Sequence, residues 1–139
     1  HLKKPMCLVH MWGSRKYLDK PNFSENAEKG VYGIATVTYF AMQMAVHMGI
    51  REIYLLGVDH KYQREQRKDG SVIVNGNIES YSWKPDASEK NVVGASWEMD
   101  VAYRFAKKYG DEKGIRIYNA TKGGCLEVFP RVNLDEIVT

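Results

Sequence analysis

An aspartate and a histidine, Asp59 and His60, stand just after a run of large apolar residues, 53–56, that predicts a strand. A carboxylate beside an imidazole can orient a ligand hydroxyl, help to hold a metal or serve as acid and base. One aspartate and one histidine fall short of the three or four ligands that a metal site needs. A strand-end aspartate often only caps a turn. We favour a functional role for this pair, because its position and its chemistry agree.

Two threonines, Thr36 and Thr38, lie where a helix is expected to begin. Backbone N–H groups and the helix dipole attract anions at such a position, and the hydroxyl groups can bind phosphate or ribose. The sequence contains neither of the two standard phosphate loops, GxGxxG and GxxxxGK[ST]. Two interpretations therefore stay open, a nucleotide contact and a plain cap of the first helical turn.

A third group of candidate residues follows a strand predicted over 115–118. Paired glycines allow the backbone to approach a ligand closely, and a lysine beside them can meet a phosphate. The same glycines can also form nothing more than a turn. The group consists of Asn119, Thr121, Lys122, Gly123 and Gly124.

The spacing of apolar side chains predicts the elements that carry these residues. It indicates a helix over 34–48 that Gly49 ends, and a second helix over 96–109. The run 53–56 follows the first helix after a tight turn, so we expect a strand buried on both faces and hence parallel to its neighbours. The residues expected on the buried face of the first helix are Val37, Phe40, Ala41, Met44, Ala45 and Met48.

With a first strand over 5–11, these elements alternate as a βαβ series. This order predicts an α/β fold, a Rossmann-like three-layer domain with a mostly parallel sheet. Ligands of such sheets bind beyond the carboxyl ends of the strands, so we expect the three candidate groups to share one rim. The long segment 61–95 carries the turn signal Asp69-Gly70 before a hairpin arm, and it is either a substrate-facing lid or a plain surface loop.

Composition and charge narrow the classes of function. The 139 residues are expected to form one domain, and 44% hydrophobic with 27% charged residues is ordinary for a soluble protein. A net charge of +3 from scattered lysines and arginines argues against nucleic acid as a partner. No apolar run is long enough to span a membrane and no signal peptide is visible, so we expect a cytoplasmic protein. The two cysteines, Cys7 and Cys125, are expected to be free thiols.

Two stretches resemble the MptE-like hydroxymethylpterin diphosphokinase domain family, GVYGIATVTYFAMQMAVHMGIREIYLLGVDHKY over 30–62 and KGIRIYNATKGGCLEVFPRV over 113–132. That family grades into Maf flagellin glycosyltransferases and into proteins encoded with surface-polysaccharide genes. The layout is also similar to Cst-type bacterial sialyltransferases, in which a T-S-G at a helix start and a G-I-D-F-Y at a strand end help to bind the nucleotide sugar. The stretch 36–38 matches the first motif, and the stretch from Gly57 to Lys61 matches the second.

The resemblance implies roles for the candidate residues. Thr36, Thr38 and Gly57 would bind the nucleotide, Asp59 and His60 would be the catalytic pair, and the segment 119–124 would complete the rim. The family's first strand and its Gly/Asn nucleotide contacts lie N-terminal to this region, so the resemblance implies that the chain is the C-terminal part of a larger domain.

This sequence departs from the sialyltransferase pattern at the catalytic base. Those enzymes use a histidine from the loop after the strand, and the segment 61–95 contains none. The departure leaves His60, or a tyrosine such as Tyr62 or Tyr81, as the substitute.

Three hypotheses follow for the function. The leading one is a nucleotide-binding transferase, most like a sialyltransferase-type glycosyltransferase of surface polysaccharide biosynthesis, with a CMP-linked sugar as donor and a small molecule or glycan as acceptor. The second is pyrophosphoryl transfer from ATP to a pterin-like alcohol, with Mg²⁺ and with Asp59 as its best ligand. The third is a ligand-binding domain of the same fold without catalysis.

Overall fold

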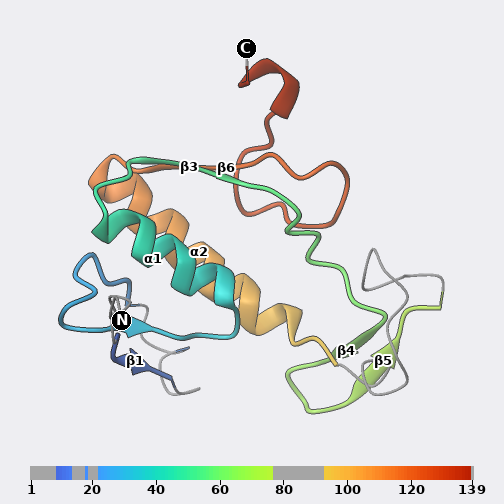
Figure 1. Ribbon diagram of the computed structural model, residues 1–139. Helices are drawn as coiled ribbons and strands as arrows, with labels where there is room; N and C mark the ends of the chain where they lie inside the picture. The colour runs from blue at the N-terminus through green and yellow to red at the C-terminus, as the bar shows by residue number, and fades with distance from the viewer. Residues whose placement is uncertain (1–8, 14–17, 19–21, 77–92, 139) are drawn as a thin grey trace, which may run out of the picture.

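Short strands and two helices alternate along the chain in the computed structural model, which describes residues 9–13, 18, 22–76 and 93–138 (Figure 1). A short 3-10 helix, Leu134–Glu136, follows the last strand. In chain order the other elements are β1 (Met11–Trp12), β2 (Val31–Tyr32), α1 (Val37–His47), β3 (Glu52–Leu55), β4 (Arg64–Gln66), β5 (Val72–Val74), α2 (Ser96–Lys113) and β6 (Arg116–Asn119).

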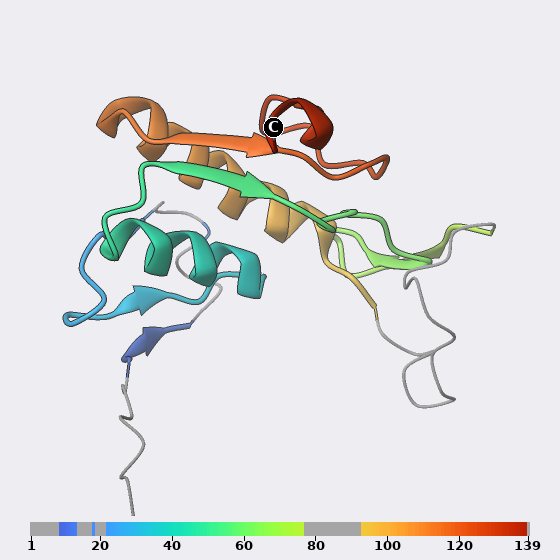
Figure 2. The same ribbon diagram turned by 45° about the horizontal axis from the view of Figure 1, so that its top comes forward.

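The strands pair two by two into three separate sheets. The pairs β1–β2 and β3–β6 are parallel, whereas β4 and β5 form an antiparallel hairpin. Figure 2 shows α1 lying between the two parallel pairs. A helix is about 10 Å wide and hydrogen-bonded strands lie about 4.8 Å apart, so these pairs cannot join into one ladder. The described residues thus form a mixed α/β fold with small sheets, and they do not show the expected three-layer Rossmann-like sheet.

The predicted helices are present with shifted ends. The first begins at Val37 rather than at residue 34, and Gly49 follows it with a positive φ of 86°. The second was expected to end at residue 109 but runs on through Gly110 to Lys113, where Gly114 is its C-cap with a φ of 68°. A Cβ at Gly110 would lie 2.8 Å from the carbonyl oxygen of Ile115, so a glycine lets the helix pass close to the chain that leaves it.

The predicted face of α1 is wrong. Val37 is 79% exposed and Met48 is 66% exposed, although both were expected in the core. The helix contains no Asp, Glu, Lys or Arg, and apolar side chains surround much of it, so spacing alone could not tell which side packs. The residues that the helix does bury are Tyr39, Met42, Gln43 and Val46.

The strand predicted over 53–56 is β3, but it is not buried on both faces. Leu55 is buried, whereas Leu56 is 56% exposed. Tyr54 stacks on Tyr118 of β6 with 5.2 Å between the ring centroids, and both rings are only half-buried. The reason is that β3 has a single neighbouring strand among the described residues and that both helices lie on the same side of the pair (Figure 1).

The outer segments of the chain were predicted with mixed success. The turn at Asp69-Gly70 does form a hairpin, since the N–H of Arg67 donates to the carbonyl of Ser71 at 2.8 Å between β4 and β5. Of the strand expected over 5–11, only Met11 belongs to β1, and residues 5–8 lie outside the described part of the chain, as do Cys7 and Tyr81.

The core lies between the two helices and the inner side of the β3–β6 pair. The two strands run in register, with Leu55 opposite Asn119, so the chain leaves both strands at the same edge. This edge is where the sequence placed two of its candidate groups. No helix among the described residues has the length and apolarity to cross a membrane. The largest side chains with almost no exposure are Tyr39, Tyr103, Phe129, Met42 and Leu126.

Candidate functional site

Side-chain hydrogen bonds join the segments that follow β3 and β6. The Oγ1 of Thr121 accepts from the N–H of Val58 at 3.1 Å and donates to the carbonyl of Leu55 at 3.4 Å. Buried Asn119 donates from Nδ2 to the carbonyl of Leu126 at 2.8 Å, and its Oδ1 accepts from the N–H of Thr121 at 2.9 Å. Thr121 therefore holds the two strand ends together, while Asn119 holds the shape of the segment after β6, and the structure brings these two candidate groups to one rim.

The paired glycines allow the closest contact at this rim. A Cβ at Gly124 would lie 2.7 Å from the carbonyl oxygen and 2.9 Å from the Cα of Asp59. The same carbonyl accepts a hydrogen bond from the N–H of Cys125 at 2.7 Å. Gly123 and Gly124 both have positive φ, 77° and 72°. A residue with a side chain at position 124 would push the two segments apart. The side chain of Asp59 itself is exposed, as is that of Lys122.

Arg131 fixes the shape of the glycine turn. Its Nη1 donates to the carbonyls of Thr121 at 3.3 Å and Gly123 at 2.7 Å, and its Nη2 donates to the carbonyl of Gly124 at 3.1 Å. The Nε and Nη2 atoms also bind Glu127, with Nη2 2.6 Å from Oε1. These hydrogen bonds hold the pKa of Glu127 below its ordinary value. Every nitrogen of the guanidinium is engaged, so one side chain holds three turned carbonyls in place.

His60 is held by a residue that the sequence analysis did not single out. Its Nε2 lies 3.0 Å from Oδ1 of Asp100 on α2, and its side chain is only 6% exposed. An ionised carboxylate only accepts, so Nε2 carries the proton in this pair. The other ring nitrogen, Nδ1, is buried and has no hydrogen-bond partner within the part of the chain that the structure describes. A neutral imidazole in this arrangement keeps Nδ1 as its basic atom.

The start of α1 lies within two contacts of this histidine. The ring of His60 meets the ring of Tyr103 edge to face at 5.6 Å, and the hydroxyl of Tyr103 lies 3.5 Å from Oγ1 of Thr36. Thr36 is the N-cap of α1, since its Oγ1 accepts from the N–H of Thr38 at 3.2 Å. The capping interpretation therefore holds for Thr36. The third candidate group thus lies close to the other two, with Tyr103 between.

Backbone strain is concentrated at the same two points. Among the described residues, Ala35 and His60 are the non-glycine residues with positive φ, 55° and 51°. Such conformations cost of order 1 kcal/mol or more and are common at functional sites. The first immediately precedes the cap of α1, and the second is the histidine of the pair with Asp100. The strain thus coincides with the chemistry that the sequence analysis proposed.

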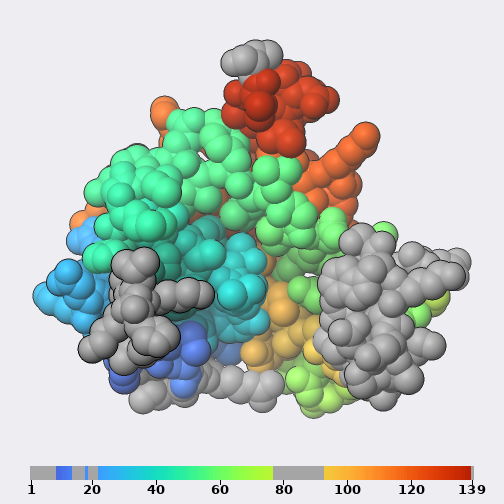
Figure 3. All heavy atoms as spheres, in the orientation of Figure 1, coloured from blue at the N-terminus to red at the C-terminus, as the bar shows by residue number. Residues whose placement is uncertain are grey.

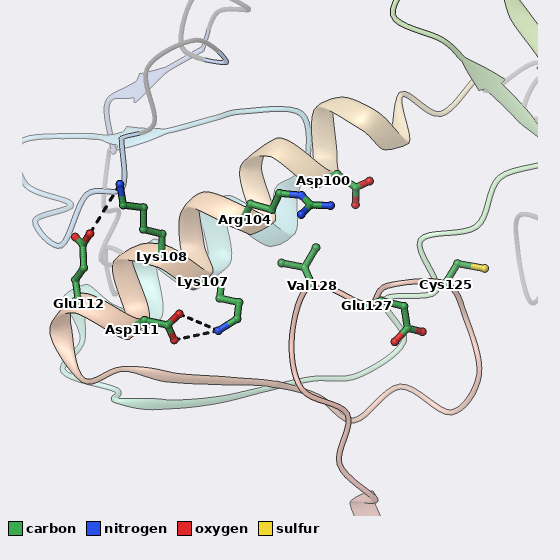
Figure 4. Close-up of a pocket in the computed structure, with 9 residues that line it drawn as sticks. All are labelled: Asp100, Arg104, Lys107, Lys108, Asp111, Glu112, Cys125, Glu127 and Val128. Carbon is green, nitrogen blue, oxygen red and sulfur yellow. Dashed lines mark hydrogen bonds and ion pairs between the residues drawn. The ribbon is translucent and has the colours of Figure 1, made fainter.

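A groove of about 550 Å³ runs along α2 beside this cluster (Figure 4). One wall is the outer side of α2, and the other is the chain after the glycine turn. Asp100 lines the groove and also binds His60, so the groove reaches the histidine through that carboxylate. The lining residues are Asp100, Arg104, Lys107, Lys108, Asp111, Glu112, Cys125, Glu127 and Val128.

The structure thus brings the three candidate groups together and adds four residues that the sequence did not indicate. Asp100, Tyr103, Arg104 and Arg131 lie 40 or more residues from Asp59 along the chain, and no local pattern marks them. Gly57 has a positive φ of 68° and open space around it, so it serves the turn that leaves β3.

The metal-binding side chains of the described residues form no metal site. No group of three or more His, Cys, Asp and Glu side chains is placed there to hold a metal ion. Asp59, the proposed Mg²⁺ ligand of the second hypothesis, belongs to no such group among the described residues. Comparison with known proteins adds no family, because no protein-family model, no curated protein and no solved structure matches this chain.

Proposed function

We propose that this chain carries the site of a nucleotide-dependent transferase of the glycosyltransferase type. The donor is a CMP-linked sugar, and the acceptor offers a hydroxyl group. The observation that carries the proposal is the His60–Asp100 pair, a buried imidazole oriented by a carboxylate with its second nitrogen free, at the carboxyl end of a parallel strand pair. The resemblance of the segments around Thr36 and Asp59 to sialyltransferase motifs supports the choice of sugar transfer.

The proposed reaction is a single displacement at the anomeric carbon. Nδ1 of His60 accepts the proton of the acceptor hydroxyl as the acceptor oxygen bonds to that carbon. The bond between the carbon and the phosphate oxygen breaks, and its electron pair leaves with the phosphate of CMP. The positive end of α1 behind Thr36 stabilises the charge that develops on the phosphate. Because Nδ1 is buried, the segment after β3 must shift when the substrates bind.

Asp100 is proposed to hold the imidazole in the tautomer that leaves Nδ1 basic. It also stabilises the imidazolium that forms when the proton is taken up. Asp59, an exposed residue at the same rim, is proposed to bind the ribose or acceptor hydroxyls. Lys122, which is exposed and precedes the paired glycines, is proposed to approach the leaving phosphate.

Nucleotide-induced thermal stabilisation tests the donor. A ligand at a hundredfold excess over its dissociation constant adds about 2.7 kcal/mol of stability, which raises the Tm of a chain of this size by roughly 8 °C. We expect CMP to raise the Tm without added metal, and Asp59→Ala to reduce that rise while the control Asp135→Ala leaves it unchanged. A chain stabilised only by ATP with Mg²⁺ contradicts sugar transfer and supports diphosphokinase activity. No stabilisation by any nucleotide contradicts both.

Donor hydrolysis or transfer tests the base. Asparagine tolerates the left-handed backbone of position 60, so His60→Asn keeps the local backbone geometry. Asp100→Asn keeps the size of the side chain and removes its charge. We expect each variant to retain CMP binding and to lose activity by about 10²-fold or more. Unchanged activity in His60→Asn would remove this residue from the reaction.

A further inference from the structure

The geometry points to a binding site for an oxyanion in the groove along α2, with Arg104 as its anchor. The ligand class is a small molecule that bears a carboxylate or a phosphate group. The assignment of this ligand to the acceptor rests on the function proposed above. The binding site itself rests on charges and contacts in the groove.

Ion pairs or hydrogen bonds engage the other charged side chains of the groove. Each of them joins residues four apart in the sequence or joins α2 to the histidine, and none of them involves Arg104. The pairs are Lys107–Asp111 at 2.8 Å, Lys108–Glu112 at 3.9 Å, Glu127–Arg131 at 2.6 Å and Asp100–His60 at 3.0 Å. Arg104 is therefore the one charged side chain lining the groove that has no hydrogen-bond or ion-pair partner among the described residues.

Arg104 forms no hydrogen bond or ion pair with any other described residue. The acid one turn before it, Asp100, is committed to His60, and the residue one turn after it is Lys108. Arginines on a helix surface are often simply solvated. Here each neighbouring lysine pairs with the carboxylate at the next turn, whereas the residue at that position for Arg104 is a lysine, so its N–H groups stay without a partner among the described residues.

The groove suits a ligand that combines an anionic group with an apolar carbon skeleton. Figure 4 shows the side chain of Arg104 extending along α2 towards Asp100, with Val128 facing it from the loop. A guanidinium presents paired N–H groups that match a carboxylate or phosphate in a bidentate way. Val128 and Cys125 offer an apolar wall to the rest of the molecule.

The position of Arg104 connects this site to the proposed chemistry. Residues four apart on a helix face have Cβ atoms about 6 Å apart. An oxyanion bound to Arg104 therefore lies one turn from the carboxylate that orients His60. A substrate held by that group would extend its hydroxyls towards the histidine, while the nucleotide occupies the start of α1. The two substrates would then approach the histidine from different sides.

Titration with three matched sugars, followed by protein NMR, tests the site. Glucose is neutral, glucuronate adds a carboxylate, and glucose 6-phosphate adds a phosphate. We expect one or both anions to shift the backbone signals of 104 and 125–128, and glucose to bind about tenfold more weakly or not at all. If only glucuronate or only the phosphate binds, that result identifies the anionic group. Equal binding of glucose, or no binding of any sugar up to roughly 10 mM, overturns the proposal.

The variant Arg104→Gln keeps most of the side-chain length and removes the charge. It should weaken binding of the anion about tenfold, whereas the matched control Lys108→Gln should change it less than about twofold. An unchanged affinity in Arg104→Gln overturns the assignment of the anchor. Both side chains are exposed, so neither change should prevent folding.

A parallel CMP titration separates this inference from the proposed function. Anion binding that depends on Arg104 in a chain that does not bind CMP supports the groove and contradicts the transferase proposal. A chain that binds CMP, and whose anion binding does not depend on Arg104, supports the transferase proposal and contradicts the site in the groove. Raising the salt concentration should weaken anion binding, because the contact is exposed.

Discussion

Helices α1 and α2 pack against each other in one core, yet they present different surfaces to the solvent. The outer side of α2 is charged and carries the pairs Lys107–Asp111 and Lys108–Glu112 at one-turn spacing. The outer side of α1 has no charged residue other than His47, and its two ends expose Val37 and Met48. Together with the chain leading to β3, α1 occupies a large part of the face shown in Figure 3.

The difference shows what orients each helix. A charged stripe can face only water, so α2 has one orientation that its sequence allows. Both sides of α1 are apolar enough to pack against the core. The side that packs is determined by a buried polar residue. Gln43 is fully buried, accepts from the N–H groups of Ser24 and Tyr32, and donates to the carbonyls of Tyr32 and Tyr39. This side chain ties α1 to β2 and to the chain before it.

Replacing Gln43 by leucine should therefore have the largest effect on stability. The variant keeps the volume but leaves the N–H of Ser24 and both backbone groups of Tyr32 without their partner. An unsatisfied group costs about 1–3 kcal/mol when fully buried, and these three are part-buried, so we expect a loss of about 3 kcal/mol. Urea denaturation followed by circular dichroism measures it. A near-neutral result would show that apolar packing alone orients α1.

The next effect concerns the start of α1. Thr36→Ala removes the only side-chain cap bond shown for this helix and should cost about 1 kcal/mol, whereas Thr36→Ser should restore most of it. α2 offers a contrast, because its N-cap Ala95 makes no side-chain bond, and Ala95→Ser should stabilise the chain by a similar or smaller amount. Denaturation midpoints of the three variants test this. If Thr36→Ala is neutral, the cap does not stabilise α1.

A smaller effect is expected on the exposed side of α1. The double variant Val37→Gln and Met48→Gln should change the stability by less than about 0.5 kcal/mol, because both side chains are largely exposed. The buried counterpart, Met42→Gln, should cost several times more. Thermal unfolding of the two proteins decides between the faces. A large loss in the double variant would mean that the exposed side of α1 packs against something in solution.

The smallest effect is a local response to pH at α2. Tyr109 donates from its hydroxyl to Glu25, and this bond holds the pKa of Glu25 below its ordinary value of 4.5. A lowered pKa means that the contact is present above the ordinary value and is lost as the pH falls through the lowered one. NMR titration of the Glu25 carboxyl should give a midpoint below 4.5, and Tyr109→Phe should return it towards 4.5. Identical midpoints in the two proteins would contradict the contact.

The sequence could predict the elements because glycines and apolar spacing act locally. Gly49 and the turn at Asp69-Gly70 were placed correctly, as were both helices and the parallel pairing after them. The number of layers was not predictable in the same way. It depends on which strands lie next to one another, and α1 separates the two parallel pairs.

The candidate site was predictable only in part, for a similar reason. Strand ends with Asp, His or paired glycines are visible in the chain, and parallel pairing brings them to one edge. Asp100, Tyr103 and Arg104 lie on α2, and their side chains are ordinary for a helix. Their roles come from contacts with His60, with Thr36 and with the groove, and such contacts depend on how the helix crosses the strand ends.

The bonds that Arg131 makes have a practical consequence for engineering this protein. A loop whose carbonyls are already held by one guanidinium does not have to be ordered when a molecule arrives, so little conformational entropy is lost there on association. Extra residues between 121 and 124 would displace the carbonyls that these bonds hold. A label or fusion partner should therefore be inserted in the exposed hairpin at Gly70, where a lengthened turn leaves the strand ends undisturbed.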